Sequence, residues 1–449
     1  MSLLGWKTFR HGVHPPEAKD ETAQLAIRQF PFAPLLVVPL SQHAGKPAIP
    51  VVREGQEVVR GQKLARPDGF VSVAMHAPAS GRVRKIALAP SIGGRMTPAV
   101  YLEPFPGSSQ EVLDGTPCSP ELATPEEIVA AIQDAGIVGL GGAAFPTHVK
   151  LAIPAGKRVE TLILNGAECE PFLTTDHRVM LEQRDDLFRG IRYLVRATGA
   201  ARVVVGIERN KPDAAAHLAA GVPADLPVEI ELLRVKYPQG AEKMLIRAVT
   251  GREVPSGKLP IDARALVVNV ATVAEIGRLL PFGRGIQERV VTVTGPAVKR
   301  KGNYRIPIGT PLRFVLETVG VDESTLNRVF LGGPMMGQAA SSLDIPLTKG
   351  VSGVVAFDDA LAAKTHRGIL PCIRCGHCLD ACPMFLNPSE MGLLARNGAF
   401  DQMADAYHLM DCFECGSCSF VCPSHIPLVQ AFRVAKTALR RAQAAQAAG

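Results

Sequence analysis

The sequence predicts an α/β multidomain protein with a metal-binding domain toward its C-terminal end. Its 449 residues amount to about three times the commonest domain size, so several hydrophobic cores are expected. A β-rich stretch is followed by alternating strand and helix patterns, and eight of the ten cysteines lie between Cys372 and Cys422. Hydrophobic residues at 47% and charged residues at 20% are typical of folded chains and exclude a disordered or fibrous protein.

Charge and hydropathy argue against other classes. The formal net charge of +7, with 5% aromatic residues and no basic run, argues against a nucleic-acid-binding protein. The sequence has no run of about 18 uncharged apolar residues and no signal-peptide core near its start. We therefore expect a cytoplasmic chain that reaches a membrane only by docking onto another protein or by a surface contact. Clustered cysteines also differ from the disulfide framework of a secreted protein.

The first half of the chain begins with β structure. Residues 1–31 are an N-terminal segment, and residues 32–105 carry short β-rich runs between Gly and Pro, which predict a barrel-sandwich domain. The runs at 55–62 and 77–83 resemble lipoyl- or biotinyl-type sandwiches. Residues 73–76 (VAMH) stand where a modifiable lysine would lie, so we expect a structural role for this domain.

Residues 120–286 are predicted to form an α/β domain. Thr124, Pro125 and Glu127 give the capping-box start of a helix. Apolar strand runs then alternate with helical patterns, which is typical of a parallel sheet covered on both faces. The expected strands are 161–164, 202–207, 228–235 and 266–270, and the expected helices are 186–198, 211–220 and 240–250.

Residues 287–358 are predicted to form a β-grasp domain. A strand, a turn, a second strand and an amphipathic helix follow one another between Arg289 and Gly320. The runs GPAV at 295–298, IGTPL at 308–312 and LGGPMMG at 331–337 resemble the soluble-ligand-binding β-grasp (SLBB) module. A packing role without chemistry is the simplest interpretation of this domain.

Residues 364–449 contain a doubled cysteine motif, C-x-x-C-x-x-C-x-x-x-C-P, repeated after 40 residues. In such repeats three cysteines serve one cubane and the fourth serves the other, so a bis-[4Fe–4S] ferredoxin-like domain is expected. One cluster would be held by Cys372, Cys375, Cys378 and Cys422, and the second by Cys412, Cys415, Cys418 and Cys382. Two zinc sites are the alternative, although zinc favours separated C-x-x-C pairs.

Helices are expected around these motifs. The fourth cysteine of each run is expected to begin a helix, and helical patterns at 388–398 and 401–410 would set the repeats side by side. Residues 427–449 predict an alanine-rich helix. Its four basic residues are expected on a solvated face, with contact to anionic lipid or to a partner as the alternative: Arg433, Lys436, Arg440 and Arg441.

A glycine run and an acidic turn are the candidate binding segments. Gly139, Gly141 and Ala144 match a dinucleotide fingerprint, but the run follows a helix instead of a strand. A phosphate- or flavin-binding loop and a glycine turn ending the helix both stay open. Glu168 and Glu170 follow the strand at 161–164, at the edge where α/β sheets bind ligands, with solvated loop glutamates as the alternative.

Four runs of the α/β domain resemble, in the same order, the FMN/NADH-site segments of the flavoprotein subunit of respiratory complex I. They are GLGGAAFPTHVK at 139–150, LNGAECEPF at 164–172, KYPQGAEKMLIRAVTGREVP at 236–255 and VVNVATVAEI at 267–276. Nearly the whole chain, from HGVHPPE at 11–17 to PSHIPLVQAFR at 423–433, resembles the C-subunit family of Rnf ion-translocating ferredoxin:NAD oxidoreductase complexes. The resemblance implies a Rossmann-like FMN/NADH domain at 120–286.

The resemblance also implies the cofactor-binding residues, with no catalytic side chain because FMN itself transfers the hydride. Two departures, Ala167 and Ala241, stand where related proteins carry acidic residues and leave the nucleotide contacts open. The implied flavin contacts are Gly139, Gly141, Gly142, Phe145 and Lys150, with Asn269 and Thr272 at the FMN phosphate. The implied pocket walls are Asn165, Glu168, Glu170, Tyr237, Gly240 and Glu242.

The function implied by the resemblance is electron transfer between NAD(H), FMN and two [4Fe–4S] clusters, linked to ferredoxin. The chain would be a peripheral subunit at the cytoplasmic face of the bacterial inner membrane, bound to other membrane subunits of a complex that transports Na⁺ or H⁺. Two other functions stay open: a non-catalytic scaffold that carries clusters, and a soluble cobalamin reductase-like NADH dehydrogenase.

Overall fold

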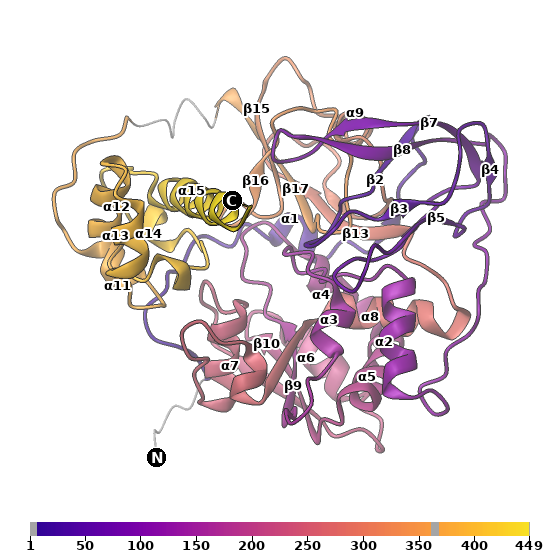
Figure 1. Ribbon diagram of the computed structural model, residues 1–449, viewed down its shortest axis with the longest axis horizontal. Helices are drawn as coiled ribbons and strands as arrows, with labels where there is room; N and C mark the ends of the chain where they lie inside the picture. The colour runs from indigo at the N-terminus through magenta and orange to yellow at the C-terminus, as the bar shows by residue number, and fades with distance from the viewer. Residues whose placement is uncertain (1–6, 361–367, 449) are drawn as a thin grey trace.

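The computed structural model describes residues 7–360 and 368–448. Figure 1 shows a β sandwich at the upper right, a parallel α/β domain below it, a mixed sheet at the upper centre and a helical lobe at the left. The N-terminal segment runs between these parts and contributes α1 (Asp20–Ala23) and β1 (Arg28–Gln29). The predicted fold class is confirmed by this architecture.

The β sandwich consists of two antiparallel sheets, with strand orders β2-β8-β7-β4 and β3-β5-β6. Its core includes Leu36, Leu64 and Leu102, which are all fully buried. Val73, Ala74 and Met75, at the hairpin where a modified lysine would stand, are fully buried as well. The strands are β2 (Leu36–Pro39), β3 (Ile49–Pro50), β4 (Glu57–Val58), β5 (Lys63–Arg66), β6 (Met75–His76), β7 (Gly81–Pro90) and β8 (Met96–Pro104).

The α/β domain is built on a four-stranded parallel sheet of order β11-β10-β9-β12. Alternate strand residues face opposite sides: Leu162 and Leu164 pack in the large core, and Ile163 packs in the core under α7. The central strand β9 is therefore apolar on both faces, as a strand inside a parallel sheet requires. The four strands are β9 (Thr161–Gly166), β10 (Arg202–Glu208), β11 (Val228–Leu233) and β12 (Ala265–Asn269).

Helices cover both faces of this sheet. The first, α2, begins with the predicted capping box, in which Thr124 and Glu127 each accept from the other's backbone N–H. The helices are α2 (Pro125–Asp134), α3 (Thr147–Leu151), α4 (Thr175–Glu182), α5 (Arg184–Thr198), α6 (Pro212–Ala219), α7 (Glu242–Thr250) and α8 (Val270–Leu279), with 3₁₀ turns η1 (Pro260–Ala263) and η2 (Leu280–Phe282).

The mixed sheet has the order β1-β14-β13-β17-β15-β16 and packs on α9 (Leu312–Thr318). Its first strand comes from the N-terminal segment: Arg28 pairs with Tyr304 in parallel register. The other strands are β13 (Glu288–Thr294), β14 (Gly302–Pro307), β15 (Leu326–Leu331), β16 (Gln338–Ala339) and β17 (Gly353–Asp358).

The helical lobe contains both cysteine motifs. Its helices pack around Met391, Met403 and Phe432, which are buried. They are α11 (His377–Ala381), α12 (Pro388–Arg396), α13 (Phe400–Asp405), η3 (Leu409–Asp411), α14 (Ser417–Phe420) and α15 (Leu428–Ala448).

Two expectations for this lobe were wrong. The fourth cysteine of a motif does not begin a helix: Cys382 caps the end of α11 with extended ψ of 110°, because a residue before proline avoids the helical region. The single helix expected at 401–410 is divided into α13 and η3, since His408 takes a left-handed φ of 52° between them. Within the described residues, no helix is both long and apolar enough to cross a membrane.

Candidate functional site

Two asparagines lie side by side at the carboxyl edge of the parallel sheet. Asn165 is the penultimate residue of β9 and Asn269 ends β12, and the two residues are paired in register. β9 lies between β10 and β12. The chain leaves β9 through α4 and α5 on one face of the sheet and reaches β12 through α7 on the other face, and such a switch point is where open α/β sheets bind ligands. The Asn269 side chain accepts from the N–H groups of Ala271 and Thr272 and so caps α8.

The glycine run forms a closed loop that faces Asn269. The Gly139 N–H donates to the Phe145 carbonyl at 2.8 Å, and the Leu140 N–H donates to the Thr272 hydroxyl at 2.8 Å. Gly141 and Gly142 lie exposed at the tip of the loop. A Cβ on Gly141 would come within 3.4 Å of the Asn269 side chain, so glycine keeps the space between loop and sheet edge open.

An ion pair links α3 to the start of α7 near the same sheet edge, and we call the glycine loop, the sheet edge and this ion pair together the rim. Lys150 Nζ on α3 donates to Glu242 Oε1 at the start of α7, at 2.6 Å, and both side chains are about one third exposed. Asn165 Nδ2 donates to the Gly240 carbonyl at 2.8 Å. Through these contacts the structure brings together nine sequence-predicted residues: Gly139, Gly141, Gly142, Lys150, Asn165, Gly240, Glu242, Asn269 and Thr272.

The rim combines open glycine backbone, amide side chains, an ammonium group and a helix N-terminus. Such groups suit a phosphate and a planar heterocycle. Phe145, half-buried, follows the glycine tip and supplies apolar surface. The residues of the rim therefore fit an FMN group.

Three further predicted residues are occupied by protein contacts. The buried Glu168 carboxylate accepts from the Thr175 hydroxyl at 3.0 Å and from the Asp176 N–H at 2.8 Å. The Glu170 carboxylate accepts from the N–H groups of Met335 and Met336, in the mixed-sheet domain. A ribose contact by either glutamate would compete with these donors, so that role stays a prediction.

Tyr237, the third of these residues, lies between the α/β domain and the helical lobe. Its hydroxyl donates to the Cys415 carbonyl at 2.5 Å, and its side chain is 1% exposed. It packs with Val13, Ala381 and Cys415 in a small apolar cluster that Cys169 also touches. Burial raises the pKa of the Cys169 thiol, so this thiol suits packing better than nucleophilic chemistry.

Sequence reasoning missed two residues that support the rim. Asp176 accepts from Asn269 Nδ2 at 2.7 Å, and burial together with the charge of Glu168 raises the pKa of Asp176. Arg289, on β13, is buried and donates to the carbonyls of Leu140 and Lys349. Burial lowers the pKa of Arg289 to about 10. An arginine inside an apolar strand run gives no sequence signal of the loop that it contacts.

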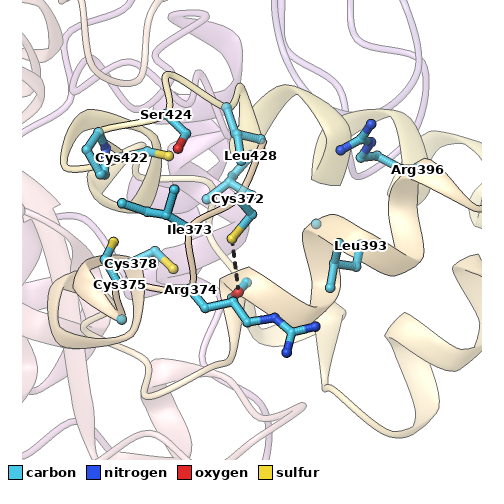
Figure 2. Close-up of a pocket in the computed structure, with 15 residues that line it drawn as sticks. Cys372, Ile373, Arg374, Cys375, Cys378, Leu393, Arg396, Cys422, Ser424 and Leu428 are labelled. Carbon is cyan, nitrogen blue, oxygen red and sulfur yellow. Dashed lines mark hydrogen bonds between the residues drawn. The ribbon is translucent and has the colours of Figure 1, made fainter. Parts of the chain in front are cut away.

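The eight motif cysteines form two groups of four in the helical lobe. We call Cys372, Cys375, Cys378 and Cys422 the outer quartet, and Cys382, Cys412, Cys415 and Cys418 the inner quartet. The outer quartet lines one pocket together with Ile373, Ser389 and Leu428, and Figure 2 shows these four side chains on its wall. The Cys372 thiol lies 3.9 Å from the Ser389 hydroxyl.

The two quartets differ in exposure. Cys372 and Cys375 of the outer quartet are exposed, whereas Cys382, Cys415 and Cys418 are at most 9% exposed. A Cβ on Gly416, in the inner loop, would come within 2.8 Å of the Met335 carbonyl, so this loop packs directly on the mixed-sheet domain. The inner quartet therefore lies at the junction of the lobe with the rest of the molecule.

The donor sets fit iron–sulfur clusters. Burial raises the pKa of the Cys418 thiol, and the neighbouring thiols of Cys415 and Cys412 raise it further. Four such thiols become thiolates together only when cationic iron balances their charge. Among the described residues, no group of three or more His, Cys, Asp or Glu side chains is arranged to hold a single metal ion.

Family models match the chain segment by segment, one for each domain of the structure. The RnfC barrel sandwich hybrid domain matches residues 7–105 and the Nuo51 FMN-binding domain matches residues 132–278. The SLBB domain matches residues 290–339 and the 4Fe-4S dicluster domain matches residues 368–426. The fold class expected from the sequence is confirmed, and an FMN-binding domain and a 4Fe–4S dicluster domain are present.

Relatives are similar over almost the whole chain. The C subunit of the proton-translocating ferredoxin:NAD(+) oxidoreductase complex of Clostridium ljungdahlii is 41% identical over 97% of this chain and 95% of its own length. The C subunit of the Na(+)-translocating ferredoxin:NAD(+) oxidoreductase complex of Acetobacterium woodii is 40% identical over 96% of each chain. An NAD+-reducing [NiFe]-hydrogenase in its H2-reduced state aligns with a TM-score of 0.47 and 22% identity, over 68% of this chain and 61% of its own.

These identities extend through all four domains, and the four family models occur in the order that the structure shows. The chain therefore belongs to the RnfC family, the C subunits of ion-translocating ferredoxin:NAD⁺ oxidoreductase complexes.

Proposed function

We propose that this chain is the subunit at which an Rnf-type complex exchanges electrons with NAD(H). It would bind FMN in the α/β domain, carry two [4Fe–4S] clusters in the helical lobe and be linked to ferredoxin through other subunits. The observation that carries the proposal is the hydrogen bond from Tyr237 to the Cys415 carbonyl, because it joins the domain of the flavin rim to the loop of the inner quartet. Electron transfer needs such proximity between redox groups.

Different residues of the rim would contact different parts of FMN. The N-terminus of α8, capped by Asn269, would face the FMN phosphate, and Lys150 would add a positive charge nearby. The exposed glycine tip would let the ring approach the backbone closely. When bound, FMN supplies the exchange between a two-electron hydride and single electrons. The protein's part is to orient the nicotinamide and exclude water.

The two quartets would hold one [4Fe–4S] cluster each, with the fourth ligand exchanged between motifs. Cys422 lines the same pocket as the first three cysteines of the first motif, which supports this pairing. The inner quartet, in which three of the four cysteines are buried, would face the flavin side. The outer quartet, in which Cys372 and Cys375 are exposed, would face another subunit. The complex would couple this exchange to transport of Na⁺ or H⁺.

The expected setting is peripheral. Relatives are named as subunits of ion-translocating complexes, and no described helix suits a membrane span. We infer attachment to membrane subunits at the cytoplasmic face of a bacterial inner membrane.

An anaerobic titration tests the proposed function. The full chain, purified with FMN and reconstituted clusters, is mixed with NADH while flavin absorbance and cluster EPR signals are recorded. Bleaching of the flavin band followed by signals from reduced clusters is expected. Protein that binds no FMN, or flavin reduction without cluster reduction, would contradict the proposal.

A scaffold function is the second candidate, and one observation favours it. The carboxylates of Glu168 and Glu170 are both occupied by protein donors. The resemblance to the complex I flavoprotein also implies acidic residues where Ala167 and Ala241 stand. A scaffold would assemble both clusters and stay unreactive toward NADH in the same titration. Cluster reduction by dithionite with no response to NADH would therefore favour this function.

A further inference from the structure

The C-terminal helix places a buried positive charge beside the inner quartet. Lys436, on α15, is 5% exposed, and its Nζ donates to the carbonyl of Cys412. The same ammonium group lies 3.1 Å from Glu414 Oε1. From the sequence this lysine was expected on a solvated face, and that expectation was wrong. The residue lies next to an apolar stripe that packs into the core of the lobe: Leu428, Phe432, Ala435 and Leu439.

Arg433, one turn earlier, anchors the helix to the same loop. Its guanidinium donates to Glu414 Oε2 at 3.1 Å and to the Met336 carbonyl at 3.2 Å. Figure 1 shows α15 crossing the lobe toward the edge of the mixed sheet near β16. Through the contacts of Arg433 with Glu414 and with Met336, the helix therefore fixes Lys436 relative to the loop that carries Cys412 and Cys415.

The outer quartet has positive neighbours of another kind. Arg374 and Arg396 line its pocket, and both are exposed to solvent. The effective dielectric constant is high at such a surface, so these charges act weakly on the sulfurs. A charge as deeply buried as that of Lys436 acts several times more strongly over the same distance.

Reduction of a [4Fe–4S] cluster adds one electron and therefore one negative charge. A fixed cation nearby stabilises the reduced form, and hydrogen bonds around the ligands act in the same direction. We propose that Lys436 raises the midpoint potential of the inner cluster selectively, and that Glu414 opposes it. This inference rests on the proposed function in one respect only, namely that both quartets carry clusters.

Removing the charge of Lys436 and removing that of Glu414 should shift the midpoint potential of the inner cluster in opposite directions. Lys436→Gln removes the buried cation and should disfavour the reduced inner cluster. Glu414→Gln removes the neighbouring anion and should favour it. Lys436→Arg keeps the charge and should stay close to the unmodified protein. Arg440→Gln, at an exposed position of the same helix, is the matched control for loss of one charge from α15.

The experiment is a redox titration of the full chain with reconstituted clusters, followed by EPR and driven by dithionite, so that neither FMN nor NADH enters the result. Cys422→Ser assigns the signals, because it removes an outer ligand. For Lys436→Gln, the ratio of reduced to oxidised inner cluster at a fixed potential should fall about tenfold, which is about 59 mV for a one-electron couple. Iron content per chain reports whether each variant still assembles.

Every outcome of this experiment is informative. An inner midpoint that falls with Lys436→Gln and rises with Glu414→Gln, while the outer midpoint stays constant, supports the inference. Equal shifts of both clusters, or no shift in either variant, overturn it. If Lys436→Gln fails to assemble its cluster, the sign of the Glu414→Gln shift decides. An unmodified protein without two cluster signals overturns the proposed function and this inference with it.

Discussion

The hydroxyl of Tyr237 donates a 2.5 Å hydrogen bond to the carbonyl of Cys415, a residue 178 positions later in the chain. Tyr237 belongs to the α/β domain and Cys415 to the inner quartet, and both are buried. Beside them, Glu170 accepts from two N–H groups of the mixed-sheet domain. Three domains therefore meet within a few side chains, and the inner quartet lies at their meeting point.

Tyr237→Phe should loosen this junction. Removing the hydroxyl leaves the buried Cys415 carbonyl without its donor, at a cost of about 1–3 kcal/mol. Amide hydrogen exchange in α14 and α15 should become faster, measured by mass spectrometry on the full chain. Tyr193→Phe is the matched control, because Tyr193 donates to the carbonyl of Cys118, in the segment just before the α/β domain and away from the junction. Unchanged exchange in Tyr237→Phe, or equal effects of both variants, would contradict the structural role.

Single cysteine variants should reveal the exchanged pairing. Cys422→Ser should remove the same EPR signal as Cys372→Ser, because both residues line one pocket. Cys382→Ser should remove the signal that Cys412→Ser removes, and each variant should lose about half of the iron. If Cys422→Ser instead matches Cys412→Ser, each motif would bind its own cluster and the pairing would be wrong.

Gly141→Val should weaken FMN binding. A β-branched side chain there would occupy the space between the loop tip and Asn269, where a Cβ already comes within 3.4 Å. Binding roughly tenfold weaker, or about 1.4 kcal/mol, is expected from flavin absorbance after gel filtration. Gly93→Val is the control, because Gly93 is exposed and its Cβ would meet no described atom within 4 Å. Equal flavin content in the two variants would count against the rim as the flavin site.

The β sandwich should lose stability in acid. Burial and the charge of Lys349 lower the pKa of His76 to about 3 and that of His43 to about 4, from about 6.5. Between these values the unfolded chain binds more protons than the folded one, so stability is full above pH 6.5 and falls as the pH decreases toward 4. Each histidine contributes a slope of about 1.4 kcal/mol per pH unit.

Calorimetry between pH 7.5 and 4 measures this slope. His76→Asn should reduce the acid sensitivity of the unfolding free energy by the share of one histidine. His425→Asn, at an exposed position outside the β sandwich, is the control variant. A slope that does not change in His76→Asn would show that this histidine does not titrate on unfolding.

Much of the fold could be predicted because its signals are local. Thr124 and Glu127 mark the start of α2 within four residues, and the continuous apolar run from Leu162 to Leu164 indicates a strand buried on both faces. The repeat spacing also predicts which cysteines share a cluster, and the pocket lined by Cys372, Cys375, Cys378 and Cys422 supports the exchanged pairing, which stays a prediction.

Contacts between domains could not be predicted in the same way. Nothing near Glu170 in the sequence indicates that its carboxylate binds the amides of Met335 and Met336, because that contact depends on how two domains pack. Lys436 had a usable signal: the stripe of Phe432, Ala435 and Leu439 marks the covered side of α15, and Lys436 adjoins that stripe. The presence of four basic residues, taken alone, suggested a solvated face and gave no sign that Lys436 is buried.

The exposure of Cys372 and Cys375 has a practical consequence for work with this protein in air. Dioxygen and chelators would reach the iron of the outer quartet through solvent, whereas the inner quartet is shielded by three domains. Preparations that age should therefore lose their iron in two stages, and the spectrum that survives longest should belong to Cys382, Cys412, Cys415 and Cys418.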